Sequence, residues 1–361
     1  MTSKDIYLSF SLAPIIGPKR LRDLLKVTKT TDKAWSATAL DFKKIGLSGE
    51  SFGKFAKFRG EFDVKTYLIK LKQKGVEIVT QEDTDYPDLL KKIDSPPIVL
   101  FTKGNKKLLN EKSIAVVGSR KTTSYGREVT QMLVSDLVRA NIVITSGLAL
   151  GVDSVAHRSA LENRGATIAV LGSGVDCCTP GENQGLYNEI LKNNGLIISE
   201  YPLGAIPTKG SFPARNRIIA GISQAILVTE ARENSGALIT ANEAVKQGKK
   251  IFAVPGSIVS VQSKGTIELL KGDAILVSTA SDVLDELNLK SVGLSTKSSF
   301  GNLNLSKEEK KIVEALESEN LSVDEVVSQV KIPIKKLILI LSELEMRGLI
   351  VSSGGKFGLK M

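Results

Sequence analysis

The sequence lacks the features of several large classes of protein. Its two cysteines, Cys177 and Cys178, are adjacent and cannot easily form a relaxed structural disulfide. Two thiols and a single histidine are too few for a structural zinc site, so we expect no metal. No apolar run approaches the length that spans a bilayer, and the N-terminus has no signal-peptide pattern. We therefore expect a cytoplasmic protein without membrane insertion.

Positive charge is in excess, but unevenly. The 361 residues carry a net charge of +10, of which +7 falls in residues 1–111, +2 in residues 112–290 and +1 in residues 291–361. A basic chain suggests polyanionic partners, whereas a lysine-rich surface also serves solubility alone. Charge by itself leaves both interpretations open, and the length allows two or three domains.

The first 75 residues have helical patterns. Leu21, Leu24 and Leu25 recur at helical spacing, and glycine turns at residues 17–18 and 45–49 separate the segments. Such turns loosely resemble helix-hairpin-helix or SAM-like modules, whose backbone N–H groups can contact phosphate. A plain helical bundle uses the same turns. We predict a small helical domain over residues 1–75.

Residues 76–288 alternate between strand and helix patterns. Strands rich in valine and isoleucine are predicted at residues 76–79, 98–101, 114–117, 142–145, 167–171, 196–199, 225–229, 251–254 and 274–277. Amphipathic helices fall between most of them, for example over residues 126–140 and 237–247. This order predicts an α/β fold with a doubly wound, mostly parallel sheet, in which ligands bind beyond the carboxyl ends of the strands.

The loops at those strand ends are rich in glycine, which lets a backbone approach a ligand closely. After the strand at 196–199, the stretch SFPARNRIIAGIS predicts a short helix with Pro213 in its first turn. Arg215 and Arg217 would add two guanidiniums to the free N–H groups of the helix start and form a phosphate seat. An arginine-capped helix paired with carboxylates is the alternative.

The usual nucleotide and catalytic patterns are missing. There is no P-loop, and Cys177 stands where a dinucleotide fingerprint beginning at Gly172 needs its third glycine. We therefore predict no cofactor. His157 lies in the helix predicted over residues 151–163 and either packs in the core or lines the loops at the strand ends; we favour packing, because no nucleophile and carboxylate are clearly placed around it. Asp153 and Ser154 are expected to cap the start of that helix.

Eight short motifs point to one family. In order they are GSR (118–120), SGLALGVDSVAH (146–157), LGSGVD (171–176), SEYPLG (199–204), FPARNRIIAGIS (212–223), TEA (229–231), SGALITA (235–241) and VPGS (254–257). Together they resemble the DprA/Smf family, the DNA-processing proteins of bacterial transformation. The resemblance implies an extended Rossmann-like core and a homodimer that binds single-stranded DNA, protects it and loads the RecA recombinase, with no catalytic residues.

The resemblance also implies a basic pocket in which Phe212 supports a base. Because strands early in such a sheet tend to be neighbours, the loop after the first core strand and the helix after the fourth should converge. Thr179 departs from the tyrosine that the family often has before a loop proline, and residues 265–267 lack its asparagine. The predicted DNA-contacting residues are Gly118, Ser119, Arg120, Gly147, Gly172, Gly174, Lys209, Phe212, Arg215, Asn216, Arg217 and Ser235.

An enzyme is the competing hypothesis. Related Rossmann-like phosphoribohydrolases carry a P-G-G-x-G-T-x-x-E loop whose glutamate does chemistry. Residues 230–236 take the place of that loop here and do not match it. Glu230 and Glu233 remain candidate carboxylates, so nucleotide hydrolysis is the alternative function.

The C-terminal residues predict a separate module. Residues 289–304 are polar and contain glycine, as in a linker. Within residues 305–361, Ser306 and Ser322 each begin a capping box, Pro333 starts a third helix, and a hairpin follows. This is a winged-helix-like pattern. The third helix contains two lysines, at 335 and 336, and two glutamates, at 343 and 345, so protein docking or oligomer support is as consistent with it as duplex DNA reading.

Overall fold

The computed structural model of the chain describes residues 1–289, 305–316, 320–353 and 355–359. The chain divides into two compact units, residues 1–294 and 295–361, which are considered separately. The predicted linker at 289–304 lies outside the described residues from residue 290 onward. Within the parts that are described, no helix is both long and apolar enough to cross a membrane.

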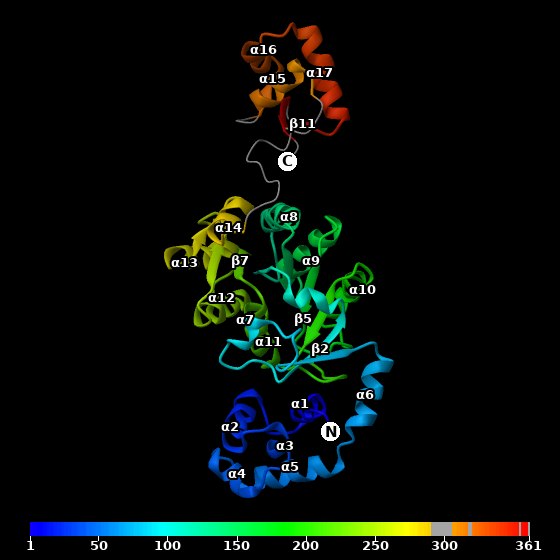
Figure 1. The fold of residues 1–361 in the computed structure, drawn as a ribbon. Helices are drawn as coiled ribbons and strands as arrows, with labels where there is room; N and C mark the ends of the chain where they lie inside the picture. Colours follow the sequence, from blue (N-terminus) through cyan, green and yellow to red (C-terminus); the bar gives the residue numbers. More distant parts are fainter. Residues whose placement is uncertain (290–304, 317–319, 354, 360–361) are drawn as a thin grey trace. The chain divides into compact units, whose positions relative to one another are not determined.

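The N-terminal part of the first unit is helical, as predicted. Its helices are α1 (Ser3–Leu12), α2 (Pro18–Thr28), α3 (Thr31–Trp35), α4 (Ala39–Lys44), α5 (Gly49–Glu61) and α6 (Val64–Gln73) (Figure 1). An aromatic cluster holds them together: the ring of Phe10 stacks on Phe55 with centroids 5.8 Å apart and meets Trp35 edge-on. Burial of such rings is the main stabilising contribution in so small a bundle.

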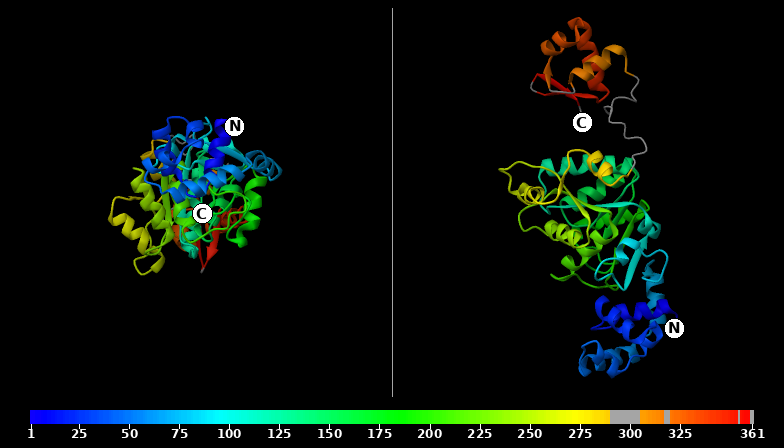
Figure 2. Two further views of the ribbon diagram at one scale, coloured as in Figure 1. Left: turned by 90° about the horizontal axis from the view of Figure 1, so that it is seen from below. Right: turned by 60° about the vertical axis from the view of Figure 1, so that its left-hand side comes forward.

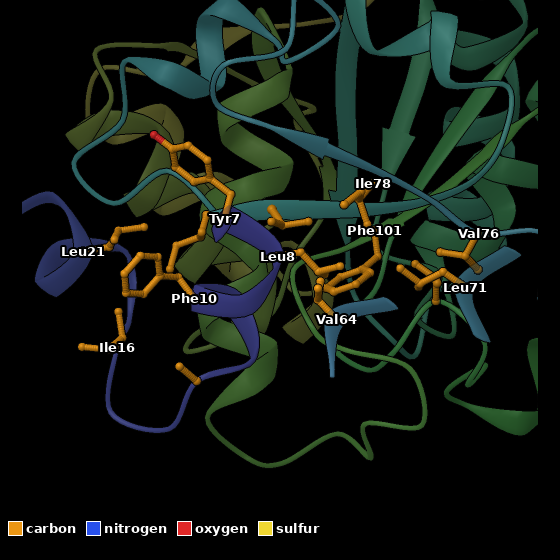
Figure 3. Packing of buried hydrophobic residues seen from close by; sticks show 14 of the residues in the cluster. Tyr7, Leu8, Phe10, Ile16, Leu21, Val64, Leu71, Val76, Ile78 and Phe101 are labelled. Carbon is orange, nitrogen blue, oxygen red and sulfur yellow. The ribbon is translucent and has the colours of Figure 1, made fainter. Parts of the chain in front are cut away.

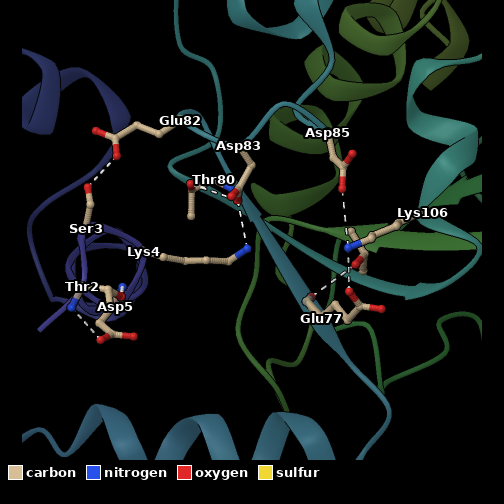
Figure 4. A network of polar contacts seen from close by, with 11 residues as sticks. Thr2, Ser3, Lys4, Asp5, Glu77, Thr80, Glu82, Asp83, Asp85 and Lys106 are labelled. Carbon is tan, nitrogen blue, oxygen red and sulfur yellow. Dashed lines mark hydrogen bonds and ion pairs between the residues drawn. The ribbon is translucent and has the colours of Figure 1, made fainter.

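Apolar packing joins this helical part to the sheet. Leu8 of α1 and Val64 of α6 lie against Phe101 of the sheet (Figure 3), and one continuous buried cluster contains all three. Polar contacts surround the joint: Lys4 pairs with Asp83 at 3.0 Å (Figure 4). The two parts therefore share a core, and the division at residues 75 and 76 stays a prediction.

The central sheet has nine strands in the order β1-β2-β6-β5-β4-β3-β7-β8-β9. The strands are β1 (Glu77–Thr80), β2 (Val99–Gly104), β3 (Ser113–Gly118), β4 (Val143–Ser146), β5 (Thr167–Val170), β6 (Leu196–Ser199), β7 (Ala225–Glu230), β8 (Lys250–Ala253) and β9 (Ile275–Leu276). All pairs from β6 to β9 are parallel, whereas β1 and β2 extend the sheet antiparallel. Figure 2 shows the helical part next to these two strands, drawn in cyan. The predicted doubly wound, mostly parallel sheet is confirmed.

Helices cover both faces of the parallel strands. In β3, Ile114 and Val116 face a core that includes α8 (Ser124–Arg139), α9 (Val152–Glu162) and α14 (Ala280–Glu286). Ala115 and Val117 face the opposite core, which includes α7 (Asp88–Lys91), α11 (Ser211–Ile222) and α12 (Gly236–Lys246). The remaining helices are α10 (Gln184–Lys192) and α13 (Lys264–Lys271), with short 3₁₀ turns at Lys106–Asn110, Gly181–Asn183 and Val261–Ser263. Alternate side chains of one strand thus pack into two hydrophobic cores, one on each face of the sheet.

The second unit contains the three helices and the hairpin that were predicted. The helices are α15 (Lys307–Leu316), α16 (Val323–Val330) and α17 (Ile334–Met346), and a three-stranded sheet has the order β10 (Leu321–Ser322), β12 (Lys356–Leu359) and β11 (Ile350–Ser353). Both predicted capping boxes are present. For example, the Ser306 amide donates to Glu309 at 2.6 Å, and the Glu309 amide donates back to the Ser306 hydroxyl at 3.2 Å.

Candidate functional site

A cavity of about 920 Å³ opens at the carboxyl end of β3. Its walls come from the end of β3 with the β3–α8 loop, the loop after β4 with the start of α9, the stretch from Pro207 to Ile219 in α11, and the β7–α12 loop with the first half of α12. β3 and β7 are neighbours, and successive strands are added on opposite sides of this pair. The cavity therefore lies at the topological switch point, where ligands bind in doubly wound sheets.

Four exposed cations line this cavity: Arg120, Lys121, Lys209 and Arg232. None of them takes part in an ion pair between described residues. Glu233 is the one exposed carboxylate in the described lining. The rim is therefore net positive, and its charges are available to an anion from solvent.

An aromatic ring stands beside one of these cations. Phe212, the second residue of α11, is half-buried, and the guanidinium carbon of Arg120 lies 5.5 Å from its ring centroid. Phe212 is therefore not a core residue. A cation over a ring is an attractive arrangement, and it places a flat apolar surface next to a positive charge in the same cavity.

Arg215 differs from the expectation of a free guanidinium at the start of α11. It is only 4% exposed, and it donates to the carbonyl oxygens of Gly147 at 2.6 Å and of Val170. Its Nε donates to Asn216 at 3.1 Å. Burial lowers the pKa of Arg215 to about 10, with Asp153 opposing the shift. Arg215 thus joins α11 to the loop after β4 and to the end of β5, although part of it lines the cavity wall.

The position of Gly147 is explained by the same arginine. A side chain at residue 147 would place its Cβ 2.5 Å from Nη1 of Arg215. The missing side chain makes room for the guanidinium, whereas we had expected the glycine to make room for a ligand. Gly147, Gly172 and Gly174 do not line the cavity.

Arg217 does not line the cavity. It forms an ion pair with Glu200, and the two side chains are 15% and 14% exposed. Burial raises the pKa of Glu200, with Arg217 opposing the rise. For this arginine the structure has the alternative arrangement, a helix-start arginine paired with a carboxylate.

Eight of the twelve predicted DNA-contacting residues line the cavity: Gly118, Ser119, Arg120, Lys209, Phe212, Arg215, Asn216 and Ser235.

The loop before α9 corrects another expectation. Asp153 does not cap the helix; its Oδ2 accepts from the amides of Gly147 at 3.0 Å and Ala149 at 3.4 Å. The cap position belongs to Gly151, whose φ of 79° favours glycine, and the Ser154 hydroxyl donates to its carbonyl. A carboxylate inside the first turn is therefore used to fix the preceding loop.

His157 is a structural residue, as expected. It is completely buried, and its Nδ1 lies 2.7 Å from the Thr167 hydroxyl. That hydroxyl donates to the carbonyl of Ile144, so it accepts from Nδ1–H. Burial lowers the pKa of His157 to about 3, which keeps the ring neutral.

Sequence reasoning missed Lys121 and Arg232 as cavity residues. Lys121 follows Arg120 directly, and Arg232 follows the TEA motif, so adjacency to predicted loops was the available signal.

Glu230, a candidate catalytic carboxylate, is buried, and its oxygens accept hydrogen bonds from the amide and hydroxyl of Thr123 at 2.9 and 2.6 Å. Among the described residues, no group of three histidine, cysteine, aspartate or glutamate side chains could hold a metal.

Comparison with known proteins identifies the family. The DNA recombination-mediator protein A family matches residues 77–288, and the DprA winged helix domain matches residues 301–356. The protein Smf of Synechocystis is 36% identical over 286 residues, covering 78% of this chain and 72% of the relative.

Two solved structures are similar as well. The X-ray structure of DNA processing protein A from Streptococcus pneumoniae has a TM-score of 0.70 at 35% identity, covering 79% of this chain and 98% of the other. A structure of DNA processing protein A from Helicobacter pylori, described for its single-stranded DNA binding mode, has a TM-score of 0.53 at 34% identity. It covers 59% of this chain and 96% of the other.

Proposed function

This chain belongs to the DNA recombination-mediator protein A family, also called DprA or Smf, and on that premise we propose that it binds single-stranded DNA in the cavity at the β3–β7 switch point. The observation that carries the proposal is the set of four exposed, unpaired cations beside one half-exposed aromatic ring. Cations that track a backbone and an aromatic that stacks on a base are the two elements of sequence-tolerant single-strand binding.

The roles of the site residues follow from their contacts. Arg120, Lys121, Lys209 and Arg232 bind phosphate oxygens, and Phe212 stacks on a base. Ser235 lies at the start of α12, where free backbone N–H groups favour an anion. Arg215 and Arg217 hold α11 in place. This assignment changes Arg217 from a contact residue to a positioning residue, because its charge is already paired with Glu200.

The biological role that we propose is that of a recombination mediator. The chain protects incoming single strands and loads the RecA recombinase onto them, acting as a cytoplasmic homodimer. The family description supports this role. The test is RecA-dependent ATP hydrolysis on single strands coated with a single-strand-binding protein, with and without this chain. Stimulation is expected; no change at saturating concentration would contradict loading.

We propose that the protein is not an enzyme. Both oxygens of Glu230 accept hydrogen bonds from Thr123, so that carboxylate is occupied by the start of α8. Glu233 is the remaining candidate from the sequence and lies at the rim of the cavity. Incubation with AMP and other nucleotides tests hydrolysis directly: release of free base that is lost in a Glu233→Gln variant would establish the enzymatic alternative.

A salt titration tests the binding proposal. Single-stranded and blunt duplex oligonucleotides of equal length are titrated at several salt concentrations by fluorescence anisotropy. We expect tighter binding to the single strand and a linear log–log salt dependence, with a slope of about 0.7 per phosphate contact. Equal or tighter binding to the duplex at every salt concentration would overturn the proposal.

We also propose that the chain divides into a helical domain (residues 1–75), a Rossmann-like core (76–288), a linker (289–304) and a winged-helix-like domain (305–361).

A further inference from the structure

One face of α17, in the C-terminal unit, is apolar and exposed. Its members are Ile338, Leu339 and Met346, which are 49%, 66% and 81% exposed. At 3.6 residues per turn they lie on the half of the helix opposite its buried residues, Leu337, Ile340, Leu341 and Leu344. Single exposed apolar side chains are ordinary, but three on one face of a 13-residue helix indicate an interaction surface.

Two unpaired charges lie on this same face. Lys336 pairs with Glu308 at 2.6 Å, and Glu345 accepts from the Ser352 amide at 3.2 Å. By contrast, Lys335 and Glu343 form no ion pair or side-chain hydrogen bond with any other described residue. Each lies four residues, about one turn, from Leu339, one before it and one after.

These two charges do not stabilise their own helix. Lys335 is in the first turn, where the helix dipole favours acidic groups, and Glu343 is in the last turn, where it favours basic groups. Their positions are therefore unfavourable within the isolated helix. A partner that brings a carboxylate to Lys335 and a cation to Glu343 would explain both.

A second copy of the same helix supplies both groups. We propose that two copies of this chain pair antiparallel through this face of α17, about a two-fold axis that passes by Leu339. Residues whose numbers are placed symmetrically about 339 then meet: Lys335 faces Glu343 of the other copy, and Leu339 faces its counterpart. A parallel pairing would instead bring the two Lys335 side chains together. Such a contact is isologous, and it closes at two copies.

The same charges disfavour the alternative of a helix that reads duplex DNA. Phosphates repel Glu343, and the three exposed apolar side chains can make only contacts with thymine methyl groups in a DNA groove. One helix against another is a small interface, so we expect weak pairing that adds to other contacts between copies through effective concentration. The inference does not depend on the proposed single-strand binding.

Crosslinking of the full chain tests the geometry. In a background with Cys177→Ser and Cys178→Ser, the Leu339→Cys substitution puts one thiol on the two-fold axis. We expect a short bismaleimide to give a covalent dimer at low protein concentration. The matched control is Lys310→Cys, an exposed position on another helix of the same unit, α15. Crosslinking at 339 no faster than at 310 would overturn the proposal.

A charge swap tests the pairing of Lys335 with Glu343. In the Leu339→Cys background, Lys335→Glu and Glu343→Lys should each slow crosslinking about tenfold, because each replaces two attractive pairs by two repulsive ones. The two substitutions together should restore the rate. If the double variant stays slow, the pairing is wrong. If duplex binding falls with Lys335→Glu and rises with Glu343→Lys while crosslinking is unchanged, α17 binds DNA instead.

Discussion

Replacing Arg215 should destabilise the fold, whereas replacing Arg120 should weaken DNA binding without destabilising it. The two arginines border the same cavity, but only Arg120 is exposed, and Arg215 is 4% exposed. Their side chains therefore have different partners in the free protein. This contrast separates a positioning arginine from a contact arginine within one site.

The magnitudes follow from those partners. Arg215→Ala would leave the carbonyls of Gly147 and Val170 and the Asp153 carboxylate without their cation in a buried place. Breaking a buried ionic network by removing one member costs about 3–5 kcal/mol of folding free energy. Arg120→Ala removes a side chain that has no hydrogen bond to lose in the free protein, so stability should change by less than about 0.5 kcal/mol. It should cost about 1.5–3 kcal/mol of binding if one charge-assisted bond to phosphate is lost.

Two assays on the same variants check this. Urea denaturation gives the free energy of unfolding, and anisotropy with a labelled single-stranded oligonucleotide gives affinity. Arg158→Ala, at an exposed position of α9 outside the cavity lining, is the control for loss of a surface arginine. Two results would refute the reasoning: normal affinity in folded Arg120→Ala protein, or Arg215→Ala protein that keeps its unfolding midpoint and has lost DNA binding.

Three other substitutions or conditions have expected outcomes. Phe212→Ala should weaken single-strand binding by about 1–3 kcal/mol with little change in salt slope, because no charge is removed; a fall in melting temperature with normal affinity would mean a packing role. A chain ending at Leu289 should keep most of its affinity in the same titration, since the cavity lies wholly in the first unit. The pKa of His157 is lowered to about 3, so the neutral ring stabilises the fold above pH 6.5 and loses that contribution as pH falls. Between pH 7 and pH 5 the loss should be about 2 kcal/mol in urea denaturation, and it should be absent in His157→Asn.

Much of the fold could be predicted because the signals are local. The strands of the core are short valine- and isoleucine-rich runs separated by amphipathic helices, and each observed end lies within three residues of the predicted one. The capping boxes at Ser306 and Ser322 are also local patterns and are confirmed. The helical N-terminus was predicted, but its packing against Phe101 in a common core was not, because such long-range contacts leave no pattern in a single sequence.

Within the site, the residue types predicted the chemistry of the side chains, but they did not predict where each side chain points. Arg120 and Lys209 are exposed in the cavity, as expected from their place in the loops. Arg215 and Arg217 occur in the same motif, yet one is buried against carbonyls and the other is paired with Glu200. A sequence shows that an arginine is charged; it does not show whether the nearest acceptor is a ligand or another part of the chain.

The order of the strands explains why these loops meet at all. We expected the first and fourth core strands to be neighbours, and this is wrong: β4 and β5 separate β3 from β6. After β6 the chain must return across β5, β4 and β3 to begin β7, and α11 is the helix that makes this crossing. Arg215, near the start of that helix, holds it to the ends of β4 and β5 through Gly147 and Val170. Phe212 is thereby placed beside Arg120 of the β3–α8 loop. The buried arginine thus allows two segments from distant strands to form one binding surface.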